Sequence, residues 1–169
     1  IHGAEIEKFE FIIKKFYSVC RNFNFKSIQT PILEQQDLFS RTVGEQTDIV
    51  SKEMYSFLDK GDAYICLRPE ATSSLARSVA SNYVSGLLKL ITHGPMFRRE
   101  RPQKGRFRQF HQINIESIGE KSPYLDFELI LIAKLLFDDL GIKDNKYKLL
   151  INSLGSQEDQ IKYANVLKK

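Results

Sequence analysis

The chain has few features that would place it in a membrane, outside the cell or around a metal ion. It contains no run of about 18 apolar residues, which excludes a membrane-spanning helix. Its two cysteines, Cys20 and Cys66, stand far apart without paired histidines, so neither a zinc site nor a disulfide framework is indicated. The opening stretch IHGAEIEKFE lacks the basic and then apolar pattern of a secretory signal. We therefore expect a cytoplasmic protein with no metal site of its own.

The composition indicates a globular domain with a mild excess of positive charge. The 169 residues are 42% hydrophobic, which is enough to bury one core and to form one domain or a large piece of one. The net charge of +4 is too small to indicate nucleic-acid binding by itself. The position of the positive charge along the chain is therefore more informative than its total.

Apolar periodicity and turn residues predict helices that alternate with short strands. Glu5–Asn22 has apolar residues at helical spacing, and Ser122-Pro123 and Gly141 mark the start and the end of a second long helix. The other predicted elements are an extended segment at 25–33, a hairpin at 54–67, a helix at 70–83, a strand at 147–152 and a helix at 157–169. The chain stops inside this last helical pattern, so we expect a truncated α+β domain.

The segment 94–119, GPMFRRERPQKGRFRQFHQINIESIG, concentrates charged and amide side chains. It predicts two strands, Met96–Arg101 and Arg108–Ile118, joined by the turn-prone PQKG. Side chains alternate between the two faces of a strand. Arg98 and Glu100 therefore share a face on the first strand. On the second strand one face carries Phe110, Gln112, Asn114 and Glu116, and the other carries His111, Ile113 and Ile115.

Two interpretations of this polar hairpin are open. In the first, the apolar face packs on a helix and the polar face meets solvent, as in most antiparallel strands. In the second, the hairpin binds an anion, because positive charges clustered on one projecting loop repel each other unless a counter-charge is present. The second interpretation is favoured by the charges on both sides of the turn, which are Arg99, Arg101, Lys104, Arg106 and Arg108.

The same segment closely resembles the motif 2 hairpin of class II aminoacyl-tRNA synthetases, and specifically that of the histidyl-tRNA synthetase family. IQTPILEQQDLFSRTVGEQTDIVSKEMYSF is similar to the motif 1 strand of that family and the segment after it, and LRPEAT is similar to its substrate-binding loop. INSLG near the end also fits. The resemblance covers nearly the whole chain, in the family's order. It implies a domain built on an antiparallel sheet flanked by helices.

The resemblance implies that the protein activates histidine with ATP, taken as its Mg²⁺ complex, and transfers the histidyl group to the 3′ end of tRNA(His). Arg98 matches the arginine that holds the amino acid carboxylate against the α-phosphate. Glu100 and Phe110 match the adenine-binding positions, and Arg106 matches the arginine that reaches the terminal phosphates. The adenylation step needs no protein nucleophile, so catalysis consists of positioning and charge stabilisation.

The resemblance also assigns the amino acid and tRNA contacts. Glu70 and Thr72, assisted by Gln112, match residues that bind the α-amino group of histidine, and Glu116 matches the carboxylate that holds the imidazole. Arg101 and Gln103 at the loop tip are implied to touch the tRNA acceptor end. The first helix and the strand after it form the homodimer interface in this family.

Two departures from the family pattern stand out. Asn114 occupies a position that is often glycine, on the face assigned to the pocket. The chain also stops before the motif 3 arginine and before the anticodon-binding domain. We therefore expect residues 1–169 to be the N-terminal portion of the catalytic domain, with motif 1 near 5–34 and motif 2 near 94–119, and to be inactive alone.

Two alternative functions are open. One is the synthetase-like regulatory subunit of ATP phosphoribosyltransferase, a non-catalytic paralogue in which motif 2 is usually degraded. The other is a dimerisation or structural fragment without a ligand. The presence of Arg98, Glu100, Arg106, Gln112 and Glu116 favours the enzyme over the regulatory subunit, whereas in a structural fragment these residues would reflect ancestry alone.

Overall fold

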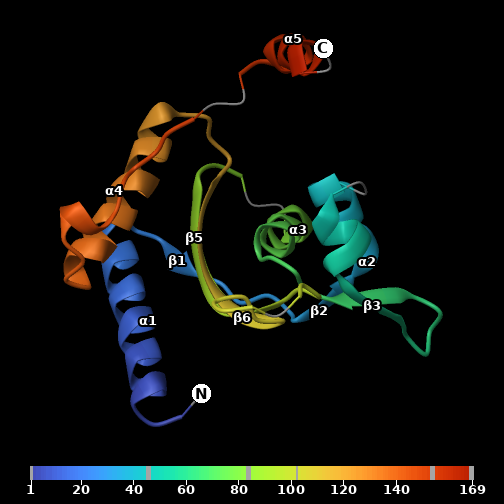
Figure 1. Ribbon diagram of the computed structural model, residues 1–169, viewed down its shortest axis with the longest axis horizontal. Helices are drawn as coiled ribbons and strands as arrows, with labels where there is room; N and C mark the ends of the chain where they lie inside the picture. The colour runs from blue at the N-terminus through green and yellow to red at the C-terminus, as the bar shows by residue number, and fades with distance from the viewer. Residues whose placement is uncertain (1, 45–46, 83–84, 102, 153–154, 168–169) are drawn as a thin grey trace.

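The computed structural model describes residues 2–44, 47–82, 85–101, 103–152 and 155–167 (Figure 1). In chain order its larger elements are α1 (Ala4–Asn22), β1 (Lys26–Ser27), β2 (Leu33–Gln35), α2 (Gln36–Phe39), β3 (Tyr55–Leu58), β4 (Tyr64–Leu67), α3 (Thr72–Asn82), β5 (Leu88–Phe97), β6 (Gln109–Ile118), α4 (Pro123–Asp139) and α5 (Gln157–Leu167). Short helical turns add η1 (Ser40–Gly44), η2 (Ile49–Glu53) and η3 (Asp144–Lys146).

The strands form two sheets of three strands each, in the orders β1-β5-β6 and β2-β4-β3. Every pairing is antiparallel except that of β1 with β5, which is parallel. The long β5–β6 hairpin keeps one register from Leu88↔Ile118 to Phe97↔Gln109. The expected α+β class, with antiparallel sheets flanked by helices, is confirmed.

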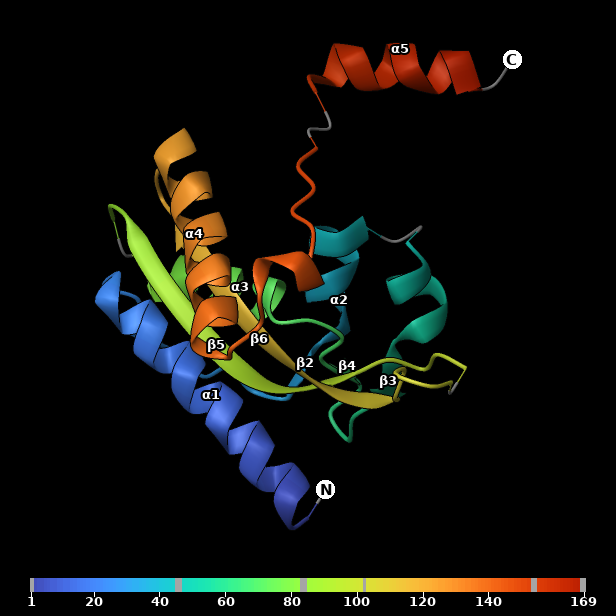
Figure 2. The same ribbon diagram turned by 60° about the vertical axis from the view of Figure 1, so that its left-hand side comes forward.

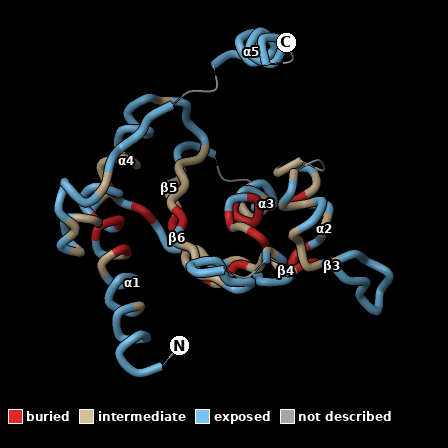
Figure 3. Tube along the Cα trace, viewed as in Figure 1, coloured by how far each residue is buried: buried red, intermediate tan, exposed pale blue. Residues whose placement is uncertain are grey.

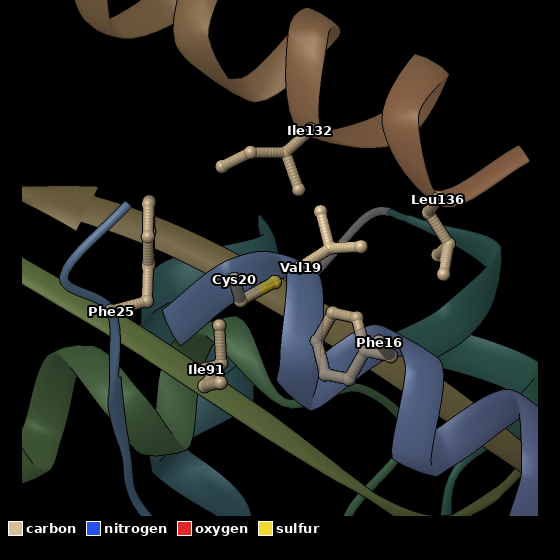
Figure 4. Close-up of a cluster of buried hydrophobic side chains, with 7 residues drawn as sticks. All are labelled: Phe16, Val19, Cys20, Phe25, Ile91, Ile132 and Leu136. Carbon is tan, nitrogen blue, oxygen red and sulfur yellow. The ribbon is translucent and has the colours of Figure 1, made fainter. Parts of the chain in front are cut away.

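Helices cover both faces of the β5–β6 hairpin. In Figure 1, α1 and α4 lie on one side of the hairpin and α3 and α2 on the other. The α1 side is filled by a cluster of buried apolar side chains drawn in Figure 4, which are Phe16, Val19, Cys20, Phe25, Ile91, Ile132 and Leu136. On the α3 side Ala71, Leu75 and Met96 are fully buried, with Phe110 packed against them. Figure 3 shows these buried segments on either side of the hairpin.

The limits of the helix α4 follow from its terminal residues, as predicted. Ser122 precedes α4, and its Oγ accepts a hydrogen bond from the backbone N–H of Tyr124 at 3.3 Å, while Pro123 occupies the first turn. Gly141 follows the helix with φ 74°, a conformation that glycine adopts without steric cost. Local residue chemistry therefore determines where α4 begins and ends.

The predicted bounds of the first strand of the polar hairpin are wrong. We predicted Met96–Arg101, whereas β5 runs from Leu88 to Phe97 and passes through Gly94-Pro95, which usually interrupt a strand. The carbonyl of Pro95 accepts a hydrogen bond from Nε of Arg68, so this edge of the residue points away from β6. The missing N–H of Pro95 lies on the same edge and costs no hydrogen bond to β6.

The predicted strand at 147–152 is also wrong. No strand includes residues 147–152, and the side chains of Leu149, Leu150 and Ile151 are 58%, 78% and 74% exposed. A strand needs a neighbour to receive its backbone hydrogen bonds, and no strand of the two sheets in the described residues is paired with this segment. The predicted helix beyond it forms as α5, which lies away from the other elements in both Figure 1 and Figure 2.

Candidate active site

The two faces of β6 differ as the alternation of its residues predicted. Phe110 packs against the cluster under α3. His111 points the opposite way, and its ring meets the ring of Phe9 on α1 edge-on, with centroids 4.6 Å apart. Ile115 packs on the same α1 side, against the core cluster there. The candidate site residues of β6 therefore face α3.

The turn before α3 carries the carboxylate of Glu70, and the first residue of α3 contacts a second carboxylate, that of Glu116 on β6. The carboxylate of Glu70 accepts hydrogen bonds from the backbone N–H groups of Thr72 (2.6 Å) and Ser73 (3.0 Å), so it caps the first turn of α3. The hydroxyl of Thr72 donates to Oε1 of Glu116 at 2.6 Å. Three of the four residues matched to histidine binding thus lie together, although Thr72 and Glu116 are 44 positions apart in sequence.

Arg98 lies at the end of β5 beside this cluster. Its Nε donates to the carbonyl oxygen of Pro69 at 3.0 Å, and its guanidinium carbon is 5.2 Å from the centroid of the Phe110 ring. A guanidinium over an aromatic face is held by a cation–π attraction. Arg98 therefore places a positive charge beside the turn that carries Glu70. In the resemblance, this arginine is expected to contact both the carboxylate of the amino acid and the α-phosphate of ATP.

Two amide side chains on the same face carry buried oxygen atoms without a hydrogen bond. Within the described residues, neither Oε1 of Gln112 nor Oδ1 of Asn114 has a partner. In the β5–β6 register Gln112 faces Gly94 and Asn114 faces Thr92. Between Phe110 and Glu116, the face therefore presents acceptors that the described part of the chain leaves unused.

The charged loop between β5 and β6 is organised by both backbone and side-chain contacts. The backbone N–H of Arg99 donates to the carbonyl of Glu53 at 2.6 Å, which ties the loop base to η2. At the tip the N–H of Arg106 donates to Gln103 O at 2.9 Å, and Gly105 between them has φ 81°. Arg101 and Gln103 are exposed there, as a tRNA contact requires.

Glu100 and Arg106 pair with each other in this loop. Their Oε2 and Nη1 atoms are 3.0 Å apart, without the angles of a regular hydrogen bond. This ion pair partly neutralises the expected cluster of positive charges. Strand alternation could not predict the pair, because β5 ends at Phe97 and the loop beyond it has no strand geometry. The Arg106 side chain is 62% exposed, so this ion pair is weak and easily exchanged.

Arg68 supports the site, and no role was predicted for it. It is 4% exposed and donates from Nη1 to Thr30 O (2.9 Å) and Thr30 Oγ1 (3.0 Å), and from Nε to Pro95 O (3.1 Å). A Cβ atom at Gly94 would overlap Nη2 of Arg68, so only glycine fits there. The sequence did contain a signal for this supporting role, namely an arginine that follows β4 and stands directly before Pro69 and Glu70.

Two cavities in the described part of the chain are lined by other residues than Glu70, Arg98 and Glu116. A cavity of about 280 Å³ lies by α1 and is lined by His93 and His111 among others, and one of about 350 Å³ lies by Glu34 and Arg77. Burial raises the pKa of both the Cys20 and the Cys66 thiols to about 12. In the described ranges no group of three His, Cys, Asp or Glu residues could hold a metal, and no helix is long and apolar enough to cross a membrane.

The fold places the chain among the aminoacyl-tRNA synthetases. More specifically, the chain belongs to the histidyl-tRNA synthetase family, whose model matches residues 2–155. It is 42% identical over 168 residues to the histidine–tRNA ligase of Macrococcus caseolyticus, covering 97% of this chain and 40% of that protein. It is 46% identical over 171 residues to the Pseudothermotoga lettingae ligase, covering 99% of this chain and 39% of that protein.

Two solved structures support the same family. Apo histidyl-tRNA synthetase of S. aureus matches with a TM-score of 0.69 and 33% identity, over 85% of this chain and 33% of that one. An ATP phosphoribosyltransferase regulatory subunit/histidyl-tRNA synthetase from Bacillus halodurans C matches with a TM-score of 0.67 and 25% identity, over 79% of this chain and 34% of that one. The chain thus spans about two fifths of the length of curated relatives that it matches.

Proposed function

We propose that the protein is a histidine–tRNA ligase, which forms histidyl adenylate from histidine and ATP and then transfers the histidyl group to tRNA(His). Residues 1–169 would supply the N-terminal portion of its catalytic domain. The observation that carries the proposal is the hydrogen bond from Thr72 to Glu116, which unites the turn before α3 with the face of β6 that also carries Phe110 and Gln112.

Arg98 is the proposed catalytic residue. When the carboxylate of histidine attacks the α-phosphate of ATP, negative charge grows on the phosphate and pyrophosphate leaves. A fixed guanidinium stabilises that charge without reorganising. The contacts of Arg98 with Pro69 and Phe110 hold its side chain in place. Mg²⁺ arrives with ATP and neutralises its terminal phosphates.

The remaining ATP contacts involve the loop and the start of β6. Phe110 and Glu100 would bind adenine, the ring by stacking and the carboxylate by accepting a hydrogen bond. Arg106 would reach the terminal phosphates, for which it has to leave Glu100. The Arg106 side chain is 62% exposed, so it can turn from Glu100 toward a phosphate of greater charge.

Histidine would lie along the face of β6 under the start of α3. Glu70, Thr72 and Gln112 would bind its α-amino group, and Glu116 its imidazole. Thr72 uses one oxygen of Glu116 and so orients the carboxylate. A site that buries partners for a polar side chain rejects analogues lacking it, by roughly 10⁴-fold or more.

Two partners are part of this proposal. Arg101 and Gln103, exposed on the loop tip, would contact the acceptor end of tRNA(His). A second copy of the protein would cover the N-terminal half of α1, where Ile6, Phe11 and Ile12 are 37%, 51% and 39% exposed. A cytoplasmic location stays a prediction from the sequence.

The likeness to the Bacillus halodurans protein keeps one second function open, that of an ATP phosphoribosyltransferase regulatory subunit. Such a subunit would bind histidine without catalysing ATP–pyrophosphate exchange. The presence of Arg98, Arg106 and Glu100, which only the adenylation reaction needs, favours the ligase.

Exchange kinetics on the full-length protein test the ligase function. We expect Glu116→Ala to lower kcat/KM for histidine by about 2 to 4 kcal/mol of transition-state stabilisation, with the KM for ATP changing far less. Glu120→Ala is the matched control, because Glu120 is an exposed acid just beyond β6. Absence of histidine-dependent exchange in the unmodified protein would contradict the function. Equal losses of catalytic efficiency for histidine and for ATP would contradict the assignment of Glu116 to the imidazole.

A further inference from the structure

Asn114 is a buried polar residue in the middle of β6. It is 9% exposed, and its Oδ1 has no hydrogen-bond partner within the described parts of the chain. Thr92, which faces it on β5, is 1% exposed. A buried acceptor without a donor is costly, and such atoms are rare unless a ligand or water supplies the donor.

Asn114 is placed between residues already assigned to histidine binding. It lies two positions from Gln112 and two from Glu116, so all three side chains leave the same face of β6. Gln112 presents a second buried oxygen without a partner in the described chain, and both Gln112 and Glu116 are partly exposed. Both oxygens are closed to solvent, so a ligand that reaches them as it enters this face finds two neutral acceptors two positions apart on one strand.

The α-ammonium group of histidine supplies the kind of donor that these oxygens lack. An α-ammonium group has three N–H donors and no acceptor. Gln112 Oε1 and Asn114 Oδ1 can accept two of them, and the Glu70 carboxylate, which keeps acceptor capacity beyond its two backbone bonds, can accept the third. Glu116, which takes the Thr72 hydroxyl, is then left for the imidazole.

We propose that Asn114 is a substrate-binding residue whose Oδ1 accepts a hydrogen bond from the α-ammonium group of histidine. The inference rests on the proposed function, because it takes histidine to be the ligand. It adds to that function a neutral acceptor at a position where the family often has glycine.

The test compares two substitutions that keep the branched shape and the number of heavy atoms of the asparagine side chain, in the full-length protein. Asn114→Asp keeps an acceptor oxygen, whereas Asn114→Leu removes it. Calorimetric titration with histidine should give a dissociation constant at least about tenfold weaker for Asn114→Leu, the loss of one hydrogen bond to a charged group, and no weakening for Asn114→Asp. Ser117→Ala is the control, because Ser117 also has a buried oxygen without a partner in the described chain but lies on the other face of β6.

Two analogues identify the group that Asn114 binds. Histidinol keeps the amine, and 3-(imidazol-4-yl)propionate lacks it. Asn114→Leu should weaken histidinol as much as histidine and leave the amine-free analogue unchanged. Equal weakening of all three ligands would overturn the proposal, since it would indicate a contact with the ring or a change in the pocket as a whole.

Thermal unfolding separates binding from a structural role. Without histidine, Asn114→Leu should unfold at the same or a higher temperature than the unmodified protein, because it removes an unpaired buried acceptor. A lower temperature would overturn the proposal. If the unmodified protein binds histidine and Asn114→Leu binds it equally well, only this inference fails. If the unmodified protein neither binds histidine nor catalyses exchange, the proposed function itself fails.

Discussion

Arg68 joins three segments that are distant in sequence. Its backbone N–H donates to Ile32 O at 2.9 Å, its Nη1 to Thr30 and its Nε to Pro95, and Phe97 N–H donates to its carbonyl at 3.0 Å. Burial lowers the pKa of its guanidinium, and the negative charge of Glu34 counteracts part of this decrease. Pro69 and Glu70 follow directly, so the position of the proposed ammonium-binding carboxylate depends on this side chain.

Arg68→Lys should destabilise the protein although it keeps the charge. A lysine ammonium cannot reproduce the planar fork that bonds Thr30 and Pro95 at once, and their buried oxygens would lose donors. We expect the free energy of unfolding to fall by about 2 to 4 kcal/mol, measured by urea denaturation. Arg21→Lys, at an exposed position on α1, serves as control. Equal midpoints for the two variants would show that Arg68 is replaceable.

The helix α1 is attached to β5 and β6 by two histidines as well as by its apolar stripe. The Tyr17 hydroxyl and Nδ1 of His93 are 2.9 Å apart, and Phe9 contacts His111. Burial, and secondarily the nearby His111, lowers the pKa of His93. Protonation of His93 is therefore disfavoured while α1 is packed against the sheet.

Stability should fall when His93 is forced to take a proton. The unfolded chain titrates near the ordinary histidine pKa of about 6.5, above the folded value, so between these values the unfolded state binds more protons. The contribution is fully present above about pH 6.5 and is lost as the pH falls below it. Thermal unfolding from pH 7.5 to 5.5 should show a smaller decrease for His93→Gln than for the exposed-site control His2→Gln. Parallel curves would contradict this assignment.

On the scale of the whole molecule, the body around the β5–β6 hairpin is distinct from the segment that ends the chain. Both buried clusters come from residues before position 140. After η3, the ring of Tyr147 still packs on Phe137, with centroids 4.8 Å apart. Beyond it, α5 stands apart in Figure 2, and Ile161, Tyr163 and Val166 are 58%, 66% and 68% exposed.

Removal of residues 149–169 should therefore leave the stability of the body unchanged. The shortened chain 1–148 keeps every residue of both buried clusters, so its thermal midpoint should equal that of the 169-residue chain. A chain without residues 1–22 is the contrasting variant, because it loses Phe16, Val19 and Cys20 from the core and should not unfold cooperatively. A large drop in midpoint for 1–148 would mean that the last segment packs on the body in solution.

Features that depend on neighbours along the chain could be predicted from the order of the residues. Ser122, Pro123 and Gly141 mark the ends of α4 because capping and backbone preferences act within a few residues. The division of β6 into a site face and an α1 face followed from Phe110 and His111, since alternation is a property of any extended strand. The part of the candidate site that lies on β6 was therefore predictable before any contact was known.

Features that need a partner far away in sequence became visible in the folded chain alone. Gly94-Pro95 lay outside the predicted strand, yet it continues β5, where the guanidinium of Arg68 packs against the glycine and donates a hydrogen bond to the proline carbonyl. Glu100 looked like a neighbour of Arg98 and instead meets Arg106 where the strand has ended. Whether the buried oxygen of Asn114 has a donor depends on every group packed around it in three dimensions. Hydrogen bonds must be satisfied in space, and the order of residues does not say which groups will meet.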